Sequence, residues 1–174
     1  MPAAPQPSLF ETTVLPHLDA AYNLARWLTR NEDDAQDVVQ EAYLRALRFF
    51  DSFRGGDGKA WLLAVVRNTA LTWLRRERGP SRVSFDEETH GADETPTVET
   101  KLVEGAKFAQ LRDCMELLPA EFREMVVMRE MEEMPYRDIA EAANLPIGTV
   151  MSRLSRARQR LLDCLAARTK EGSK

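Results

Sequence analysis

Arginines are the most prominent residues whose type and spacing could do chemistry, and they fall in two separate stretches. In the first, Arg67 and Arg75 share one side of a helix predicted over residues 59–78. Trp61 and Trp73 accompany them. Guanidinium groups hold phosphates and indole rings stack on bases, so the pattern is typical of a nucleic-acid surface. Basic residues are common at the C-terminal end of a helix, where they complement the helix dipole. That explains Arg75, but it does not explain Arg67 in the middle of the helix.

The second stretch follows a helix-turn-helix pattern. A short helix is predicted over 136–143, a turn over 144–146, and a longer helix from Pro146 onward. Between residues 146 and 170 there are six basic residues and one acidic residue. A basic second helix after so short a turn indicates insertion into the DNA major groove. The alternative interpretation is a basic amphipathic helix on a helical hairpin.

A third pattern lies on a helix predicted to start at Asp33 and Asp34, which suit an N-cap and an acidic first turn. Its apolar residues recur at three- and four-residue steps on one face: Ala35, Val38, Val39, Ala42, Tyr43, Ala46, Leu47 and Phe50. Leu44 lies on the opposite face among acidic side chains. A single exposed leucine is common. Framed by acids, it also suits a docking site for a partner with basic residues.

Catalytic and metal chemistry find no support in the sequence. There are two cysteines, Cys114 and Cys164, and two histidines, His17 and His90, which do not cluster. No glycine-rich phosphate loop occurs, although Gly55, Gly56 and Gly58 break the helical pattern and permit a close backbone approach. We expect no cofactor, and we expect both cysteines to be small buried thiols, with a redox role as the alternative.

Length and composition exclude further classes of protein. The chain has 174 residues, is 44% hydrophobic and 30% charged, and carries a net charge of −4, which excludes a uniformly basic nucleic-acid coat. No apolar run is long enough to span a membrane, and the N-terminus lacks the pattern of a signal peptide. We therefore expect a cytoplasmic protein with reduced thiols and no membrane insertion.

Helical periodicity without strand signals predicts an all-α fold of two small domains, 9–78 and 106–167. Between them, residues 79–105 are rich in Gly, Pro, Ser and Thr. Seven acidic residues and one basic residue lie within 83–105. That composition predicts a flexible acidic linker, extended by self-repulsion.

The two halves together resemble bacterial RNA polymerase sigma factors of the extracytoplasmic-function (ECF) class. In the first half, residues 34–46, 53–56 and 60–76 resemble the family's region two helical bundle. In the second half, residues 117–119, 136–140 and 148–158 resemble the region four helix-turn-helix. Each motif alone is moderately specific for the family, and the two motifs in this order are strong evidence for the resemblance.

The resemblance implies three surfaces. One docks core RNA polymerase through Asp37, Gln40, Glu41, Leu44 and Arg48. The second recognises and melts the minus-ten promoter element through Arg54, Lys59, Trp61, Arg67, Asn68, Arg75 and Arg76. The third reads the minus-thirty-five element through Thr149, Ser152, Arg153, Ser155, Arg156 and Arg160.

The resemblance also implies that a separate anti-sigma factor masks these faces until a signal or stress removes it. Two other functions compete with the promoter-specificity subunit. A free-standing helix-turn-helix regulator would bind DNA tightly alone, but the acidic stripe with Leu44 argues against it. A sigma-like decoy for an anti-sigma factor would not need the DNA-reading arginines, which are present.

Overall fold

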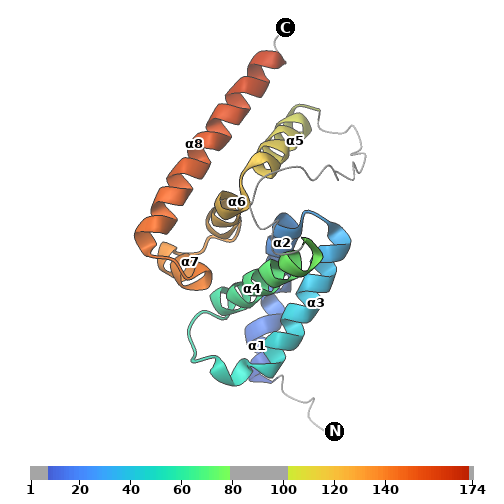
Figure 1. Ribbon diagram of the computed structural model, residues 1–174, viewed down its shortest axis with the longest axis vertical. Coiled ribbons are helices and arrows are strands. Elements are labelled where there is room, and N and C mark those ends of the chain that lie inside the picture. Colours follow the sequence, from blue (N-terminus) through green and yellow to red (C-terminus); the bar gives the residue numbers. More distant parts are fainter. Residues whose placement is uncertain (1–7, 79–101, 173–174) are drawn as a thin grey trace, which may run out of the picture.

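The computed structural model describes residues 8–78 and 102–172, and every regular element in these two ranges is a helix (Figure 1). The predicted all-α class with two helical domains is confirmed. The acidic linker falls mostly on residues 79–101, outside the described ranges. In the second range, α5 starts at Leu102, earlier than the expected resumption of helix near Ala106.

The N-terminal unit is a bundle in which α2, α3 and α4 pack against one another. Its elements are α1 (Leu9–Val14), the 3-10 turn η1 (Leu15–His17), α2 (Leu18–Thr29), α3 (Glu32–Arg48), the 3-10 turn η2 (Phe50–Ser52) and α4 (Gly58–Arg78). Small buried residues such as Ala21, Ala25, Ala42 and Ala46 fill its core. They let the helices approach closely.

The start of α3 differs from the prediction. Asn31 is the N-cap residue, and its side-chain oxygen accepts a hydrogen bond from the Asp34 amide at 3.0 Å. Asp33 and Asp34 instead occupy the first turn with Glu32, where their charges complement the helix dipole. The expected N-cap at Asp33 or Asp34 is therefore wrong, because Asn31 supplies the same kind of acceptor earlier in the chain.

The C-terminal unit contains the helix-turn-helix. Its elements are α5 (Leu102–Leu117), α6 (Ala120–Val126), the π-helical turn η4 (Val127–Met131), α7 (Tyr136–Ala143) and α8 (Ile147–Glu171). Asn144 ends α7 in the left-handed conformation with a φ of 54°. Asparagine tolerates that backbone better than most residues, so it can turn the chain within three residues toward α8. Val150, Leu154 and Ala157 form the buried stripe of α8.

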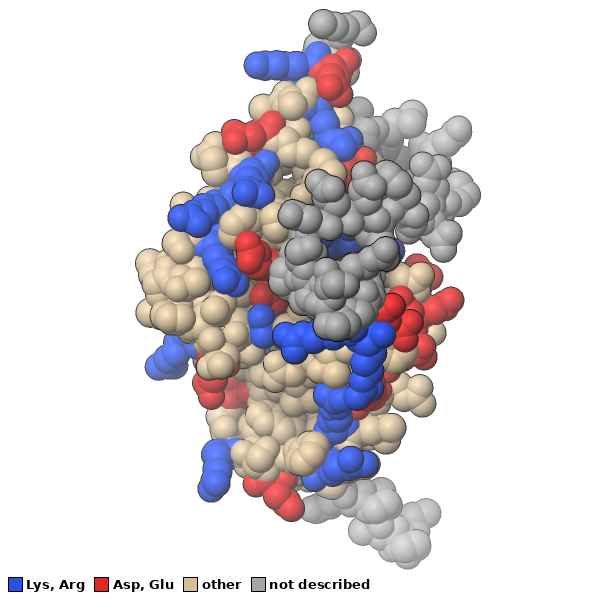
Figure 2. Space-filling model, viewed as in Figure 1, with Lys and Arg blue, Asp and Glu red and all other residues tan. Residues whose placement is uncertain are grey.

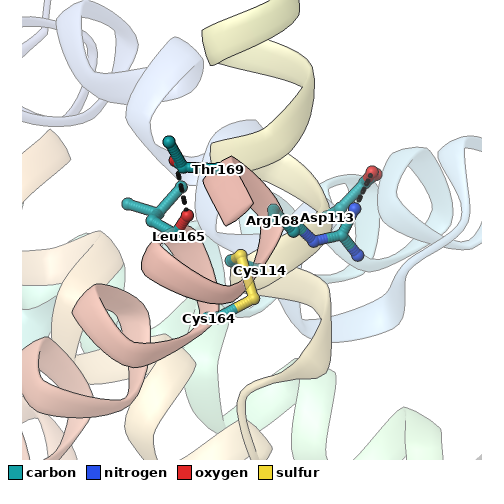
Figure 3. The surroundings of a disulfide bond; sticks show 6 residues. All are labelled: Asp113, Cys114, Cys164, Leu165, Arg168 and Thr169. Carbon is teal, nitrogen blue, oxygen red and sulfur yellow. Dashed lines mark hydrogen bonds and ion pairs between the residues drawn. A yellow bond between two sulfur atoms is a disulfide. The ribbon is translucent and has the colours of Figure 1, made fainter. Parts of the chain in front are cut away.

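Cys114 and Cys164 are joined by a disulfide bond between α5 and α8 (Figure 3). The expectation of two reduced thiols is therefore wrong. The two helices run antiparallel, and each cysteine lies on the face toward the other helix, with the two Cα atoms 5.9 Å apart. Arg168 on α8 donates to Asp113 on α5 at 3.1 Å beside the bond. The two cysteines are 50 positions apart, and no local pattern in the sequence connects residues at that distance.

The two units pack directly against each other. Helix α4 contacts α7, and α2 contacts α6 and η4. Buried apolar residues of both units form one continuous cluster, which runs from Leu24 and Val66 to Met125 and Ile139. The sequence left open whether the domains touch. The described residues form one body in which α4 lies at the centre (Figure 1).

Candidate polymerase and nucleic-acid interfaces

The predicted docking stripe lies along the outer face of α3. Asp37, Gln40, Leu44 and Arg48 are all exposed, and Leu44 has an exposed fraction of 57%. They recur at three- or four-residue steps, so they share one side of the helix. Glu41 is half-buried and accepts a hydrogen bond from Arg45 at 2.7 Å. The arrangement is an apolar centre with a polar border, as docking sites commonly have.

The stripe is broader than predicted. Leu47 was assigned to the buried face, but it is 52% exposed, and Phe49 at the end of α3 is 57% exposed. Leu47 follows Gln40 by seven residues and lies within ~20° of it around the helix. The assignment of Leu47 to the core is therefore wrong. Leu44, Leu47 and Phe49 give this part of the surface a larger exposed apolar area than one leucine would.

The glycine-rich loop before α4 is shaped by its backbone. Gly55 and Gly56 have φ values of 85° and 92°, which side-chain-bearing residues rarely adopt. A Cβ atom on Gly58 would lie 2.6 Å from the Thr13 Cγ2 atom, so the expected close backbone approach is to α1. Arg54 projects from this loop and is exposed.

Trp61 is half-buried in an aromatic cluster rather than free on the surface. Its ring meets Phe50 edge-on with centroids 5.9 Å apart and Phe53 with centroids 5.5 Å apart. Phe50 in turn contacts Phe10 of α1. The cluster fixes the loop between η2 and α4, so Trp61 holds the loop in place and leaves part of its ring accessible.

The remaining predicted minus-ten residues divide into two groups. Asn68 in the middle of α4 is exposed, as are Arg75 and Arg76 near its C-terminal end. Arg76 also lies 3.8 Å from Glu41, which connects this group to the docking stripe on α3. Seven residues separate Asn68 from Arg75, which places them on one side of the helix.

Lys59 and Arg67 form the second group, which contacts the C-terminal unit. Arg67 donates to the Glu124 carboxylate through Nε at 2.6 Å and through Nη2 at 3.0 Å. The Lys59 ammonium donates to the Glu132 carbonyl oxygen at 2.6 Å and lies 3.1 Å from its carboxylate. In this arrangement both side chains bind oxygen atoms of the C-terminal unit, and Lys59 remains half-buried. The sequence showed that Arg67 lay in mid-helix but gave no sign of its partner.

Glu124 is one of the few charged residues buried in the described ranges, at 3% exposure. Burial raises the pKa of Glu124 above its usual range, because water no longer solvates the carboxylate. The hydrogen bonds and charge of Arg67 oppose that rise, as does the charge of Arg153 from α8. Glu124 therefore interacts with an arginine from each of the two predicted DNA-binding helices.

On α8, five of the six predicted minus-thirty-five residues lie within ~100° of one another around the helix. They are Thr149, Ser152, Arg153, Arg156 and Arg160. Ser155 is exposed on a neighbouring flank. Ser152, Arg156 and Arg160 are exposed, and the Arg160 guanidinium also stacks over the Phe122 ring at 4.8 Å. Thr149 and Arg153 are half-buried.

The surface charge follows these elements. Figure 2 shows Lys and Arg side chains along α8 and over the part of this face that α3 and α4 form, separated by acidic and uncharged areas. In the described ranges, no group of three or more His, Cys, Asp or Glu residues is placed to hold a metal ion. A helix with both the length and the apolar character to cross a bilayer is likewise absent from these ranges.

Comparison with known proteins agrees with this geometry. The family description Sigma-70 region 2 matches residues 13–79, and Sigma-70, region 4 matches residues 108–161. The chain is 34% identical over 146 residues to the ECF RNA polymerase sigma-E factor of Haemophilus influenzae, which covers 78% of this chain and 76% of that protein. The chain belongs to the ECF sigma factor family.

A further relative is the ECF RNA polymerase sigma factor SigE of Mycolicibacterium smegmatis. It is 34% identical over 164 residues, which cover 93% of this chain and 63% of that protein, so the chain spans less than two thirds of that relative. Within the family, the N-terminal unit corresponds to region 2 and the C-terminal unit to region 4.

Two solved structures have a similar fold. The sigma factor RpoE of Bartonella quintana, solved in complex with the anti-sigma factor NepR, matches with a TM-score of 0.69 and 26% identity. That match covers 90% of this chain and 96% of RpoE. CnrH, solved with the cytosolic domain of CnrY, matches with a TM-score of 0.64 over 91% of this chain and 88% of CnrH. At 24% identity the second likeness concerns the fold alone.

Proposed function

We propose that this ECF sigma factor binds core RNA polymerase and directs initiation at a specific set of promoters. The observation that carries the proposal is that one chain holds an exposed acidic and apolar stripe centred on Leu44 and a basic helix-turn-helix. A free-standing DNA-binding regulator needs only the second. The role involves binding and strand separation without covalent chemistry, and it takes place in the cytoplasm, where polymerase and chromosome are.

The residues divide this work among the three surfaces. The α3 stripe with Leu44 docks on polymerase. Asn68, Arg75 and Arg76 of α4, with Arg54 of the preceding loop, hold the minus-ten element as it opens. Ser152 and Arg156 of α8 contact the minus-thirty-five duplex, with Arg153 completing that face. Base capture in the opened strand is driven by stacking and phosphate contacts.

We also propose that a separate anti-sigma factor controls this protein in response to a signal or stress. The support is that RpoE, which is similar over 90% of this chain, was solved in complex with an anti-sigma factor. A protein that masks DNA-binding and polymerase-binding surfaces would bind across both units. The acidic segment that remains between them, within residues 83–101, would pass through the basic channel of polymerase in the active complex.

A run-off transcription assay tests the proposal. Bacterial core polymerase is mixed with the oxidised protein and a genomic fragment library, and the transcript starts are sequenced. New starts that share two spaced motifs are the expected result. Retention on core polymerase without any new start would favour a decoy. Specific duplex binding by the protein alone, without retention on polymerase, would favour a free-standing regulator.

The double substitution Arg75→Ala and Arg76→Ala tests whether these two residues act in opening the minus-ten element. We expect loss of permanganate-reactive thymines at the start site, while the closed complex still forms, because these residues contact the strand only when it opens. Equal loss of closed and open complexes would contradict the assignment. Arg45→Ala, which removes a nearby arginine paired within α3, is the matched control.

A further inference from the structure

We propose that Ile147 and Met151 of α8 contact thymine methyl groups in the minus-thirty-five element, so that this helix reads bases by apolar contact as well as by hydrogen bonds. The inference rests on the proposed function for the presence of duplex DNA against α8. The features that lead to it all lie in the first turns of that helix.

Ile147 and Met151 form an exposed apolar pair at the start of α8. They are 49% and 51% exposed, whereas Val150, which lies between them in the sequence, is fully buried. Four residues separate the two, so their side chains are neighbours on one side of the helix. The pair therefore lies outside the buried stripe of α8 and faces solvent.

The pair borders the predicted base-reading face. Around the axis of α8, Ser155 lies about 40° from Met151 and about 60° from Ser152, so it connects the apolar pair to the predicted contacts. Ser152, Ser155 and Arg156 are all exposed. In a helix-turn-helix, the N-terminal turns of the second helix approach base edges in the major groove. Ile147 and Met151 occupy those turns, ahead of Arg156.

Gly148 indicates that a partner approaches the backbone closely at this point. A Cβ atom on Gly148 would meet no atom of the described residues within 4 Å, and its φ is not positive. Neither packing nor backbone conformation therefore requires a glycine here, although glycine is unfavourable within a helix. Around the axis, Gly148 lies between Met151 and Ser152. It leaves room for an external group in the middle of the exposed face.

The charge around the pair favours DNA over a protein as the partner. No acidic residue occurs in the sequence from Ile147 to Leu162, which contains four arginines: Arg153, Arg156, Arg158 and Arg160. Figure 2 shows an uncharged area where α8 starts, with Lys and Arg side chains beside it. Phosphates complement such a border. Thymine is the base with a methyl group in the major groove, and apolar side chains recognise it there through that methyl.

The probe for this inference is a promoter duplex that the polymerase complex uses in the run-off assay. Each thymine of its minus-thirty-five element is replaced in turn by deoxyuridine, which still pairs with adenine and lacks only the methyl group. Burying one methyl group contributes about fourfold in affinity. At one or more positions we therefore expect the wild-type complex to bind the uracil duplex about fourfold more weakly. Phosphate contacts are the same in both duplexes and cancel in this ratio.

Replacing either apolar side chain should remove the difference. At the position that each residue contacts, we expect Ile147→Ala and Met151→Ala to bind the thymine and uracil duplexes with affinities that differ by less than about twofold. Leu162→Ala is the matched control, because Leu162 is an exposed apolar residue about three turns further along the same helix. It should keep the fourfold ratio. Circular dichroism confirms that the three variants stay helical.

Met151→Arg tests the same position by a change of specificity. A guanidinium group donates two hydrogen bonds to the O6 and N7 atoms of guanine. We expect this variant to lose the preference for thymine and to prefer guanine there by about tenfold. A Met151→Arg variant that still prefers thymine would overturn the inference.

A minus-thirty-five element without thymine would also overturn it, as would equal binding of the thymine and uracil duplexes by the wild-type complex at every position. A fourfold ratio that persists in both alanine variants, with weaker retention on polymerase without DNA, would assign the pair to a protein partner instead. Failure of the proposed function has another signature, since no new transcript starts appear. The same comparison is then made on a duplex that the protein alone selects from a random library. Absence of any selected duplex would overturn both proposals.

Discussion

Region 2 closes its core with small side chains, whereas region 4 uses long, flexible ones and a covalent link. Seven alanines are buried in region 2: Ala20, Ala21, Ala25, Ala35, Ala42, Ala46 and Ala70. In region 4 the buried core includes Met115, Met125, Met128 and Met134, and Cys114 is bonded to Cys164. Alanine permits close helix packing, while methionine fills irregular gaps and adapts to change.

The difference in core packing corresponds to the binding surface that each region exposes. Region 2 offers α3 as a fixed stripe, and its packed bundle keeps that stripe in one shape. In region 4, α8 extends well beyond its last fully buried residue, Ala157, and its C-terminal half is held by α5 through the disulfide and the Arg168–Asp113 pair. Region 2 is thus stabilised by packing throughout, and region 4 partly by a link that reducing agents can remove.

The largest expected effect comes from removing the disulfide bond between Cys114 and Cys164. In the chain-entropy treatment, a bond across 50 residues stabilises by about 4 kcal/mol. We expect the pair Cys114→Ser and Cys164→Ser to lose most of this in region 4. All three tryptophans, Trp27, Trp61 and Trp73, lie in region 2, so fluorescence reports on that unit and circular dichroism on both. Urea should separate the two transitions in the variant. Coincident transitions at the wild-type urea concentration would contradict the comparison.

The second prediction tests the fixed stripe of region 2. Leu44→Asp should weaken binding to core polymerase by about 2–4 kcal/mol, because it places a charge at the apolar centre of an interface. Its unfolding free energy should not change, since Leu44 contacts solvent. Leu9→Asp is the control, as Leu9 is 68% exposed on α1 outside the stripe. Titration of labelled core polymerase measures both. Equal losses from the two variants would remove Leu44 from the docking site.

The third prediction concerns the exposed arginines of α8. Arg156→Ala should cost about 1–3 kcal/mol in promoter binding by the polymerase complex if Arg156 contacts a base through two hydrogen bonds. Arg158→Ala removes the same charge from the same helix, but Arg158 is paired with Glu130, so its effect should be smaller. Binding is measured at one fixed salt concentration. A larger loss from Arg158→Ala would place the reading face elsewhere on α8.

The smallest expected effect is local to region 2. Asn31→Ala removes the acceptor that caps α3 and should lower the unfolding free energy by about 1 kcal/mol. Asn31→Asp keeps a carboxylate oxygen at the same place and should change it by only a few tenths. Tryptophan fluorescence in urea measures both. If the alanine variant were as stable as wild type, the cap would contribute nothing to holding α3.

Local patterns in the sequence determined much of this protein. Helical periodicity predicts the all-α class, and the turn at Asn144 predicts the helix-turn-helix. The position of Leu44 opposite the apolar face predicts that its side chain is exposed. These features depend on residues within about a dozen positions of one another, where spacing alone decides which side chains share a face. The motifs that resemble the ECF family are local in the same sense.

Contacts between distant parts were decided only by the tertiary structure. Arg67 and Glu124 are 57 residues apart, and Cys114 and Cys164 are 50 apart. No pattern of spacing connects such pairs, because the path of the chain between them is set by how whole helices pack. Leu47 shows the same limit at short range, since helical periodicity places it near the edge of the apolar face and only the position of neighbouring helices decides that it is exposed.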